Sequence, residues 1–407
     1  MSRNVAVIGA GASGIVAAIA AARCGASVSI FEHTDSIGSK IMITGNGKCN
    51  YTNEDIRPEH YHSGTDEDGL IASILERFGY EDCTGFFGSL GIIGKNRRGG
   101  IYPYTDTAES VRSALKLELK RLGVEIICGC RNTGLERASG GDIRVKNDLV
   151  PDGRVFDAVI LSCGGKAARK TGSDGSGFEL VRSLGVVTTD IFPALTPLPV
   201  KEDLSMLTGI RCDASLKLIN EKGRVIERSS GELQPYDKGL SGICALDISG
   251  NACRRTGAGE RVFVECDFYP GTDDEGFKRM MADRREAFPE RDLTGLLTGI
   301  FPRKLIRYMA HPIDIRKDSW PDDLKDIVKH HRYEVSRDIL KDMSRAQTSA
   351  GGVSLGEIDC NCMLRREQDI YVTGEMLDVD GICGGYNLHF AWATGYIAGG
   401  AAAGDNS

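Results

Sequence analysis

NVAVIGAGASGIVAAIAAARCGASVSIFE, at residues 4–32, lays out the first structural unit of this 407-residue chain. Residues 5–8 are small and apolar, which is typical of a parallel strand buried on both faces. An alanine-rich helix is expected over 15–23, and a second strand over 28–31. Strand, turn, helix and strand in this order predict a Rossmann-like α/β unit.

Three glycines between the first strand and the helix are spaced as G-x-G-x-x-G. The first permits a tight turn, the second lets the backbone approach a pyrophosphate, and the third lets the helix pack on the strand. Glu32, at the end of the second strand, is placed to accept hydrogen bonds from a ribose 2′-hydroxyl. The sequence therefore predicts a dinucleotide site, with the pyrophosphate at the helix N-terminus. The residues expected to bind the cofactor here are Gly9, Gly11, Ala12, Ser13, Gly14 and Glu32.

The composition is that of an ordinary globular protein, with 41% hydrophobic and 26% charged residues. The formal net charge of −7 argues against a nucleic-acid-binding surface, and no apolar run reaches the ~20 residues of a transmembrane helix. The 13 cysteines include no C-x-x-C pair, which favours reduced thiols over disulfides or a metal site. The N-terminus lacks the layout of a secretion signal. We therefore expect a cytoplasmic protein that binds a small molecule, and neither nucleic acid, membrane nor metal.

The segment GSKIMITGNGKCNYTN at residues 38–53 is rich in glycine and small polar residues. A loop of this kind after the ribose-binding strand can fold over a ligand, and Lys40 and Lys48 can offset the charge of a pyrophosphate. A solvated surface loop is the alternative interpretation. The candidate cofactor-binding residues in this segment are Lys40, Gly47, Lys48, Cys49 and Asn50.

The order of these motifs resembles one bacterial family of FAD-dependent flavoproteins, which includes aminoacetone oxidase and 3-dehydro-bile-acid reductase. Its members combine G-x-G-x-x-G, an acidic residue, G-x-K and a glycine-asparagine loop that ends in CN-x-TN. In that family the loop usually reads SGGGRCNLTN, whereas here it reads TGNGKCNYTN. Lys48 replaces the arginine of the family, so the charge is kept and the bidentate geometry is lost. The resemblance implies FAD as the cofactor.

The C-terminal segment TGEMLDVDGICGGYNLHF, at residues 373–390, carries the most specific part of this resemblance. It follows a strand expected at 370–372 and leads into a helix expected over 388–402. The resemblance implies that Asp378 bonds the ribityl or pyrophosphate part of FAD, and that the helix N-terminus points at the N1–C2=O edge of the flavin. A terminal helix that closes the sheet without a ligand is the alternative. The cofactor-binding residues implied here are Gly374, Glu375, Asp378, Gly385, Tyr386 and Asn387.

Two further glycines, Gly164 and Gly165, follow the strand expected at 155–161. Glycines directly after a buried strand indicate close backbone approach. Members of the resembled family usually place Thr-Gly-Gly against FAD at this point. A structural turn is the alternative interpretation.

The composition of the sequence changes near residue 191, and the earlier glycine-rich composition returns near residue 346. Prolines mark the first boundary, and short β runs are then followed by a charged helical stretch with few glycines. We therefore predict an α/β protein with a Rossmann-like FAD-binding domain built from 1–190 and 347–407. An inserted domain at 191–346, β-rich and then helical, would hold the substrate. The resembled family has such an insertion.

Candidate catalytic residues are fewer. Tyr236, Asp237 and Lys238 lie in the insertion, where many family members have Phe-Thr-His, so the role of that histidine cannot be carried over. These three are candidates for substrate contact or proton transfer. His389, inside the last helix, either faces the flavin or packs in the core. Cys49 is either a flavin adduct site or a small buried side chain.

The function expected from these features is FAD-dependent oxidoreduction, with hydride transfer between the flavin and an organic substrate. Reduction of an activated C=C bond with NAD(P)H as donor competes with oxidation of an amine by O₂. The segment YDKGLSGI, at residues 236–243, is closer to the GISGI form of reductase-like members and favours reduction. A flavin-binding protein without turnover and a plain NAD-binding protein are the rival interpretations. The C-terminal motif speaks against the second, because a nicotinamide-only fold has no need for it.

Overall fold

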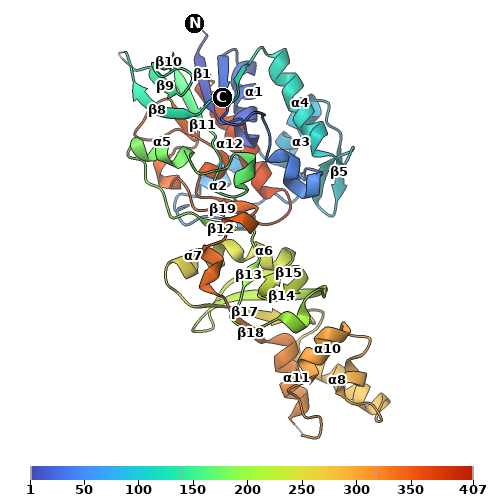
Figure 1. The fold of residues 1–407 in the computed structure, drawn as a ribbon. Coiled ribbons are helices and arrows are strands. Elements are labelled where there is room, and N and C mark those ends of the chain that lie inside the picture. Colours follow the sequence, from blue (N-terminus) through green and yellow to red (C-terminus); the bar gives the residue numbers. More distant parts are fainter. Residues whose placement is uncertain (1, 139, 318, 406–407) are drawn as a thin grey trace. The chain divides into compact units, whose positions relative to one another are not determined.

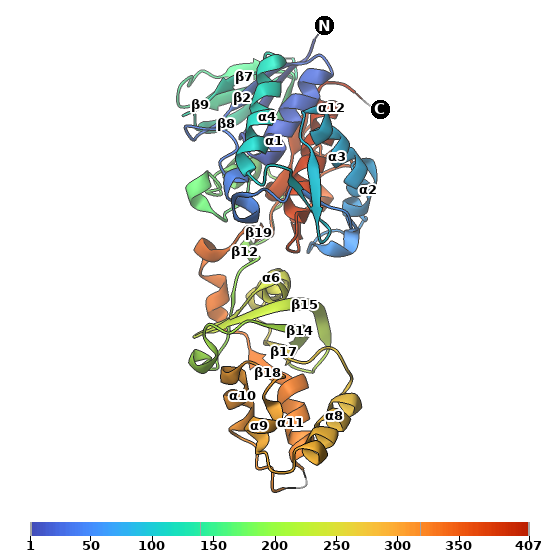
Figure 2. The ribbon, with the colours of Figure 1, turned by 90° about the vertical axis from the view of Figure 1, so that its right-hand side faces the viewer.

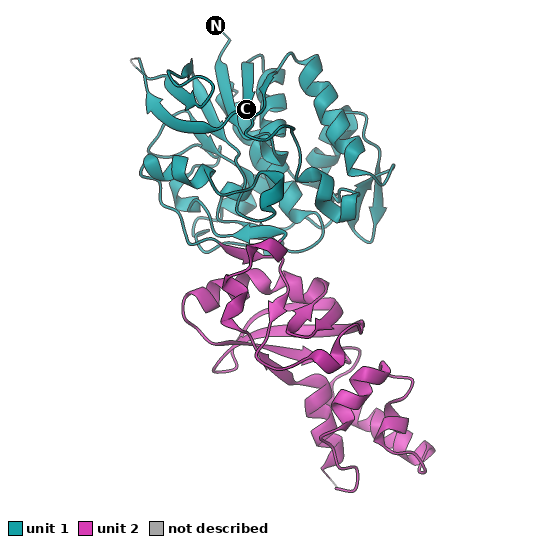
Figure 3. Cartoon of the chain, in the orientation of Figure 1, with its two compact units in different colours: residues 1–191, 347–407 teal, residues 192–346 magenta. Residues whose placement is uncertain are grey.

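The computed structural model describes residues 2–138, 140–317 and 319–405, and the chain forms two compact units (Figures 1 and 3). Unit 1 contains residues 1–191 and 347–407, so both ends of the chain contribute to it. Unit 2 contains residues 192–346. Within the described ranges, no helix combines the length and the apolar character needed to cross a bilayer.

Unit 1 is built on a five-stranded parallel sheet in the order β20-β11-β1-β2-β7. Its strands are β1 (Asn4–Ile8), β2 (Ser27–Phe31), β7 (Glu125–Ile127), β11 (Ala158–Leu161) and β20 (Ile370–Val372). The side chains of β11 and of residues 5–8 in β1 are buried, as expected for parallel strands covered on both faces. The sheet joins the N-terminal strand to a strand from the last forty residues, and this confirms the expected Rossmann-like architecture built from both chain ends.

Helix α1 (Ala12–Arg23) packs along α12 (Tyr386–Ala402) in unit 1 (Figure 2). Glycines on α12 permit this close approach. A Cβ added at Gly395 would lie 2.3 Å from the Ser13 carbonyl oxygen, and one at Gly399 would lie 2.3 Å from the Ala17 carbonyl oxygen. The two ends of the chain are therefore held together by helix packing as well as by the sheet.

The remaining elements of unit 1 surround this core. The helices are α2 (Leu70–Arg77), α3 (Tyr80–Ser89), α4 (Ala108–Arg121) and α5 (Gly177–Ser183). The short strands are β3 (Thr52–Asn53), β4 (Tyr61–His62), β5 (Gly94–Arg97), β6 (Gly100–Pro103), β8 (Asn132–Arg137), β9 (Ile143–Asn147), β10 (Arg154–Phe156), β19 (Thr348–Ala350) and β21 (Asp380–Gly381). Strand β5 could not be predicted from a hydrophobic pattern, because its sequence GKNR is polar and mostly exposed.

Unit 2 contains a six-stranded antiparallel sheet in the order β13-β16-β15-β14-β17-β18. Its strands, with β12 (Phe192–Ala194), are β13 (Leu198–Pro199), β14 (Cys212–Asn220), β15 (Val225–Tyr236), β16 (Gly239–Ser241), β17 (Val262–Asp267) and β18 (His331–Glu334). Its helices are α6 (Ile243–Asp247), α7 (Ser249–Gly257), α8 (Asp274–Ala287), α9 (Leu293–Leu297), α10 (Arg303–Ala310) and α11 (Trp320–Lys329). A β-rich and then helical insertion was expected, and the structure differs in that the last strand, β18, follows the helical stretch.

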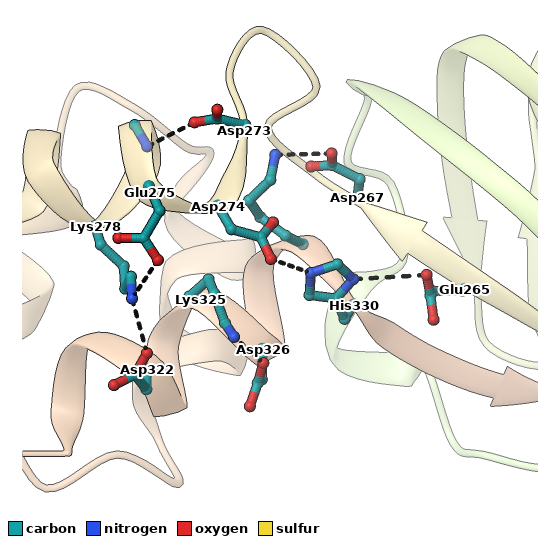
Figure 4. A network of polar contacts seen from close by, with 12 residues as sticks. Glu265, Asp267, Asp273, Asp274, Glu275, Lys278, Asp322, Lys325, Asp326 and His330 are labelled. Atoms are coloured by element: carbon teal, nitrogen blue, oxygen red, sulfur yellow. Dashed lines mark hydrogen bonds and ion pairs between the residues drawn. The ribbon is translucent and has the colours of Figure 1, made fainter.

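A polar network fastens the helical part of unit 2 to its sheet (Figure 4). Lys329, whose side chain is 3% exposed, donates to Asp267 Oδ2 at 2.8 Å and to two backbone carbonyl oxygens nearby. The next residue, His330, pairs with Asp274 Oδ2 at 2.9 Å and lies 3.5 Å from Glu265 Oε1. The end of α11 is thereby tied both to β17 and to the start of α8.

Candidate active site

A cleft in unit 1 opens at the carboxyl ends of β1, β2 and β11, where open α/β sheets bind their ligands. It is lined by residues from the segments 8–13, 31–44, 131–132, 162–180, 347–348 and 374–391, and all of these described residues belong to unit 1. Its empty volume, including the space open to solvent, is about 1280 Å³. The cleft therefore brings together both motif-bearing ends of the chain.

The three motif glycines differ in what surrounds them. Gly9 has φ +98°, and a Cβ there would lie 2.5 Å from the Ser162 carbonyl oxygen. A Cβ at Gly14 would lie 2.0 Å from the Gly9 carbonyl oxygen. Gly11 has no such neighbour: the nearest atom, the Ser162 carbonyl oxygen, would lie 4.0 Å away, and Gly11 lines the cleft. Two glycines are thus required by packing, while the third leaves room for a ligand, and this fits a pyrophosphate.

The first turn of α1 faces the same space through Ala12 and Ser13. The first N–H group bonded inside this helix is that of Ile15, which donates to the Gly11 carbonyl oxygen at 3.1 Å. Among the described residues, no side chain caps the start of this helix. The earlier N–H groups and the helix dipole therefore form a site suited to an anion.

Glu32 lines the cleft directly after β2, and its side chain contacts the segment that follows β1. It is 7% exposed. Its Oε2 accepts from the Ala10 N–H at 2.8 Å, and its Oε1 accepts from the N–H and the hydroxyl of Thr34, both at 2.8 Å. Because a carboxylate can accept about four hydrogen bonds, these three leave capacity for one from a ribose. The same carboxylate therefore shapes the turn and lines the cleft.

Lys40 and Glu375 both line the cleft, and they form an ion pair with each other. Lys40 Nζ also donates to the Ala167 carbonyl oxygen at 3.2 Å, and Glu375 Oε1 accepts from the Ser349 N–H at 2.9 Å. A Cβ at Gly165 would lie 2.6 Å from Glu375 Oε1, so Gly165 makes room for this pair, while Gly164 lines the cleft itself. The Lys40 charge is therefore already balanced by the protein.

The second half of the glycine-asparagine loop turns away from the cleft. Lys48 is exposed, and Cys49 is fully buried, where burial raises the pKa of its thiol to about 12. The Asn50 side chain lies against Gly100 and Gly385, because a Cβ at either glycine would lie within about 3.2 Å of its amide. Neither these three residues nor Gly47 are among the lining residues, whereas the earlier loop residues Lys40 and Thr44 are.

Some residues of the C-terminal motif line the cleft and others do not, as in the glycine-asparagine loop. Gly374, Glu375 and Asn387 line the cleft. Asp378 is 1% exposed and instead accepts from the Gly64 N–H at 3.0 Å and from the Thr65 hydroxyl at 3.1 Å.

The start of α12 is held in place by three consecutive residues, 385–387. Tyr386 is buried and packs its ring against His60 and Tyr61. Gly385, with φ +100°, precedes the helix, and a Cβ there would lie 2.8 Å from the Thr52 carbonyl oxygen. Asn387 is held by Gly381, through bonds of 2.9 Å and 2.7 Å to its N–H and carbonyl groups. The first turn of α12 therefore faces the cleft in a fixed orientation.

His389 is fully buried, and both of its ring nitrogens have protein partners. Nε2 lies 3.0 Å from the Phe78 carbonyl oxygen, and Nδ1 lies 2.7 Å from the Thr52 hydroxyl. A carbonyl oxygen only accepts, so Nε2 carries the hydrogen and Nδ1 accepts from Thr52. Burial lowers the pKa of His389 to about 4. The arrangement is that of a neutral packing residue outside the cleft.

The other catalytic candidates lie in a groove of unit 2. Tyr236, Asp237 and Lys238 line it together with Arg345, and its empty volume is about 1070 Å³. The Arg345 guanidinium carbon lies 4.8 Å from the centre of the Tyr236 ring, and burial raises the pKa of that phenol. The structure therefore places the three predicted residues in one groove, with an arginine that the sequence did not single out.

The polar residues that line the unit 1 cleft but were not predicted from the sequence include Asn132, Ser173 and Gln347. Asn132 lies beyond β7, near the carboxyl edge of the sheet where ligands bind, and this position becomes evident only from the structure. Ser173 lies in the glycine-rich segment TGSDGSG, at residues 171–177. Nothing in the sequence marks Gln347.

Comparison with known proteins identifies the family. The family described as HI0933-like protein Rossmann domain matches residues 3–401. A 3-dehydro-bile acid delta(4,6)-reductase of Clostridium scindens is 40% identical over 98% of this chain and 99% of its own length. A ribosomal RNA dihydrouridine synthase of Haemophilus influenzae is 26% identical over 97% of each chain.

Among solved structures, a 3-ketosteroid delta1-dehydrogenase from Sterolibacterium denitrificans has a TM-score of 0.52. It is 12% identical, and the match covers 100% of both chains. At this identity the similarity describes the fold, which is the α/β architecture with an inserted antiparallel sheet.

Proposed function

The chain belongs to the HI0933-like Rossmann-domain family and is an FAD-dependent oxidoreductase, and from this premise we propose that it reduces a carbon–carbon double bond conjugated to a carbonyl group in a small organic substrate. NAD(P)H is the proposed electron donor. The observation that carries the proposal is that one cleft of unit 1 brings Gly11 and Glu32 together with the first turn of α12. A long dinucleotide such as FAD needs recognition at both of its ends, and this cleft offers it.

The proposed roles in the cleft follow from the contacts. Gly11 and the first N–H groups of α1 hold the pyrophosphate, and Glu32 holds a ribose hydroxyl. Bound FAD supplies hydride transfer to or from the substrate. The N-terminus of α12, through Asn387, favours negative charge at its end of the cleft. Gly164, Gly374 and the ion pair of Lys40 with Glu375 form the walls.

The proposed reaction is the one that the two named relatives have in common. The name of the Clostridium scindens protein describes reduction at Δ4 and Δ6, next to a 3-oxo group. Dihydrouridine is uridine with hydrogen added across C5=C6, which is conjugated to the C4 carbonyl. Both products thus arise from hydrogen added to an electron-poor double bond, and that is the class of substrate we propose here.

A small molecule is the proposed partner. The 40% identical relative is named for a bile acid, and the net charge of −7 disfavours a polyanion. Ribosomal RNA is the second candidate, because the 26% identical relative is named for it. The 13 cysteines are thiols and none is joined in a disulfide, which supports a cytoplasmic location.

We propose unit 2 as the substrate domain. The cleft is lined by unit 1 alone, so the cofactor does not require residues 192–346. The groove with Tyr236, Asp237, Lys238 and Arg345 offers an aromatic face and both charges to a substrate. The contacts proposed for these residues are with the substrate, not with FAD.

The proposal is tested by steady-state turnover of the purified protein without oxygen. NADH or NADPH oxidation should depend on an added 3-oxo-Δ4 steroid, and a saturated 3-oxo steroid should not support it. A ribosomal RNA transcript tests the second candidate, and an amine supplied with O₂ tests the oxidase alternative. Turnover with the amine and O₂ alone would contradict the proposal.

A further inference from the structure

Asn132, the first residue of β8, lines the cleft. The Oδ1 atom is buried and accepts no hydrogen bond from any described residue. Buried polar atoms are nearly always paired, and one left unpaired in a cleft indicates that a ligand supplies the partner.

The backbone before Asn132 is held rigidly beside Glu32. The Cys130 N–H donates to the Glu32 carbonyl oxygen at 2.9 Å. Asp148 forms two hydrogen bonds with the backbone of Arg131. The Asp148 Oδ1 accepts from the Arg131 N–H at 2.9 Å, and the Asp148 N–H donates to the Arg131 carbonyl oxygen at 3.0 Å. The position of Asn132 is therefore fixed by the fold before any ligand arrives.

The residues that share the cleft with Asn132 combine hydroxyl groups with an apolar side chain. Thr34, two residues after Glu32, lines the same cleft as Ser173 and Leu180. The Arg131 guanidinium bonds Asp174 at 3.2 Å, which joins β8 to the segment before α5. Because Glu32 is the proposed ribose-binding carboxylate and the Cys130 backbone is bonded to it, we assign the part of the cleft at Asn132 to the base.

We propose that Asn132 recognises the adenine of FAD, with its Oδ1 accepting a hydrogen bond from the 6-amino group. A carboxamide combines an acceptor and a donor on one edge, as does adenine at its amino group and the adjacent ring nitrogen. This inference rests on the FAD site proposed above. It makes Asn132 a determinant of base specificity, outside the reacting part of the cleft.

The test compares ligands that differ only at the base. The apo-protein is titrated with FAD, with the FAD analogue whose adenine is replaced by hypoxanthine, and with FMN, and binding is followed by flavin fluorescence. Hypoxanthine carries an acceptor where adenine carries the amino group. The wild type should bind FAD about tenfold more tightly than the analogue, the effect of leaving one buried acceptor unpaired.

Two substitutions separate the acceptor from the bulk of the side chain. N132L removes the acceptor while keeping a side chain of similar size. This variant should bind FAD and the hypoxanthine analogue about equally tightly, with FMN binding unchanged. N132D keeps an acceptor and should retain the preference for adenine. T133A changes the exposed neighbour, which does not line the cleft, and should behave as wild type.

The outcomes are distinct. If the wild type binds FAD without discriminating against the analogue, or if N132L keeps the discrimination, the inference about Asn132 is wrong while the FAD site stands. If N132L weakens FAD, the analogue and FMN equally, Asn132 is structural and the inference fails. A folded wild type that binds no FAD would overturn both this inference and the proposed function.

Discussion

Lys40 and Glu375 form an ion pair inside the cleft although they lie 335 positions apart in the sequence. Their side chains are only 22% and 17% exposed. The pair connects the loop after β2 to the segment after β20, so it holds two walls of the proposed FAD site at a fixed separation.

Removing one partner of this pair should destabilise the protein. K40M leaves Glu375 partly buried without its cation, and we expect the free energy of unfolding to fall by about 1–3 kcal/mol. The double variant K40M/E375Q should recover part of that loss, since no charge then lacks a partner. Urea unfolding of the apo-proteins measures both values, and equal stability of wild type and K40M would show that the pair contributes nothing.

Glu32 should contribute strongly to FAD affinity. E32Q keeps the shape but loses the charge-assisted bond to the ribose, so FAD should bind about ten- to a hundredfold more weakly. E125Q is the matched control, because Glu125 lies on the neighbouring strand β7, outside the cleft. An unchanged dissociation constant in folded E32Q would mean that Glu32 only shapes the turn through Ala10 and Thr34.

His389 should make stability depend on pH. Its pKa is about 4 in the folded protein against an ordinary 6.5, so the unfolded chain takes up a proton first as the pH falls. The stabilisation is complete above about pH 6.5 and is lost towards pH 4, by about 3 kcal/mol at most.

Urea unfolding between pH 7 and pH 4 tests this prediction with H389N, which has no group that titrates in that range. The stability of the wild type should decline more steeply than that of H389N. H311N, at an exposed histidine, should follow the wild type. Parallel curves for the wild type and H389N would contradict the assignment.

The groove of unit 2 should affect the substrate and not the cofactor. Replacement of Tyr236, Asp237 and Lys238 by alanine should leave the flavin spectrum intact and raise KM or lower kcat by at least about tenfold. The control replaces the exposed residues Arg279, Asp283 and Glu286 of α8. Loss of FAD from the folded triple variant would assign the groove to the cofactor site, and unchanged kinetics would exclude it from the substrate site.

The Rossmann unit could be predicted from the sequence because its signals are local. The strand, the glycines and Glu32 lie within one continuous stretch, and each has a direct steric or hydrogen-bonding reason. The C-terminal strand β20 and helix α12 could likewise be predicted from their own sequences.

Side-chain direction could not be predicted, because it depends on distant segments. Val379 lines the cleft, while its neighbour Asp378 turns to Gly64 and Thr65, far away in the sequence. The orientation of His389 depends on Thr52 and Phe78, which no pattern inside α12 reveals. Asn132 is found only when the end of β7 is seen beside Glu32.

The most direct test of the account is a single half-reaction without oxygen. The flavin of the purified protein is reduced by NADPH or light, excess donor is removed, and a 3-oxo-Δ4 steroid is added. We predict that the oxidised flavin spectrum returns and that one equivalent of the steroid with its conjugated double bond saturated is formed, while the already saturated 3-oxo steroid has no effect. A flavin that stays reduced with the steroid and is reoxidised only by O₂, in a protein whose oxidised flavin is reduced by an amine, would contradict the proposed reaction.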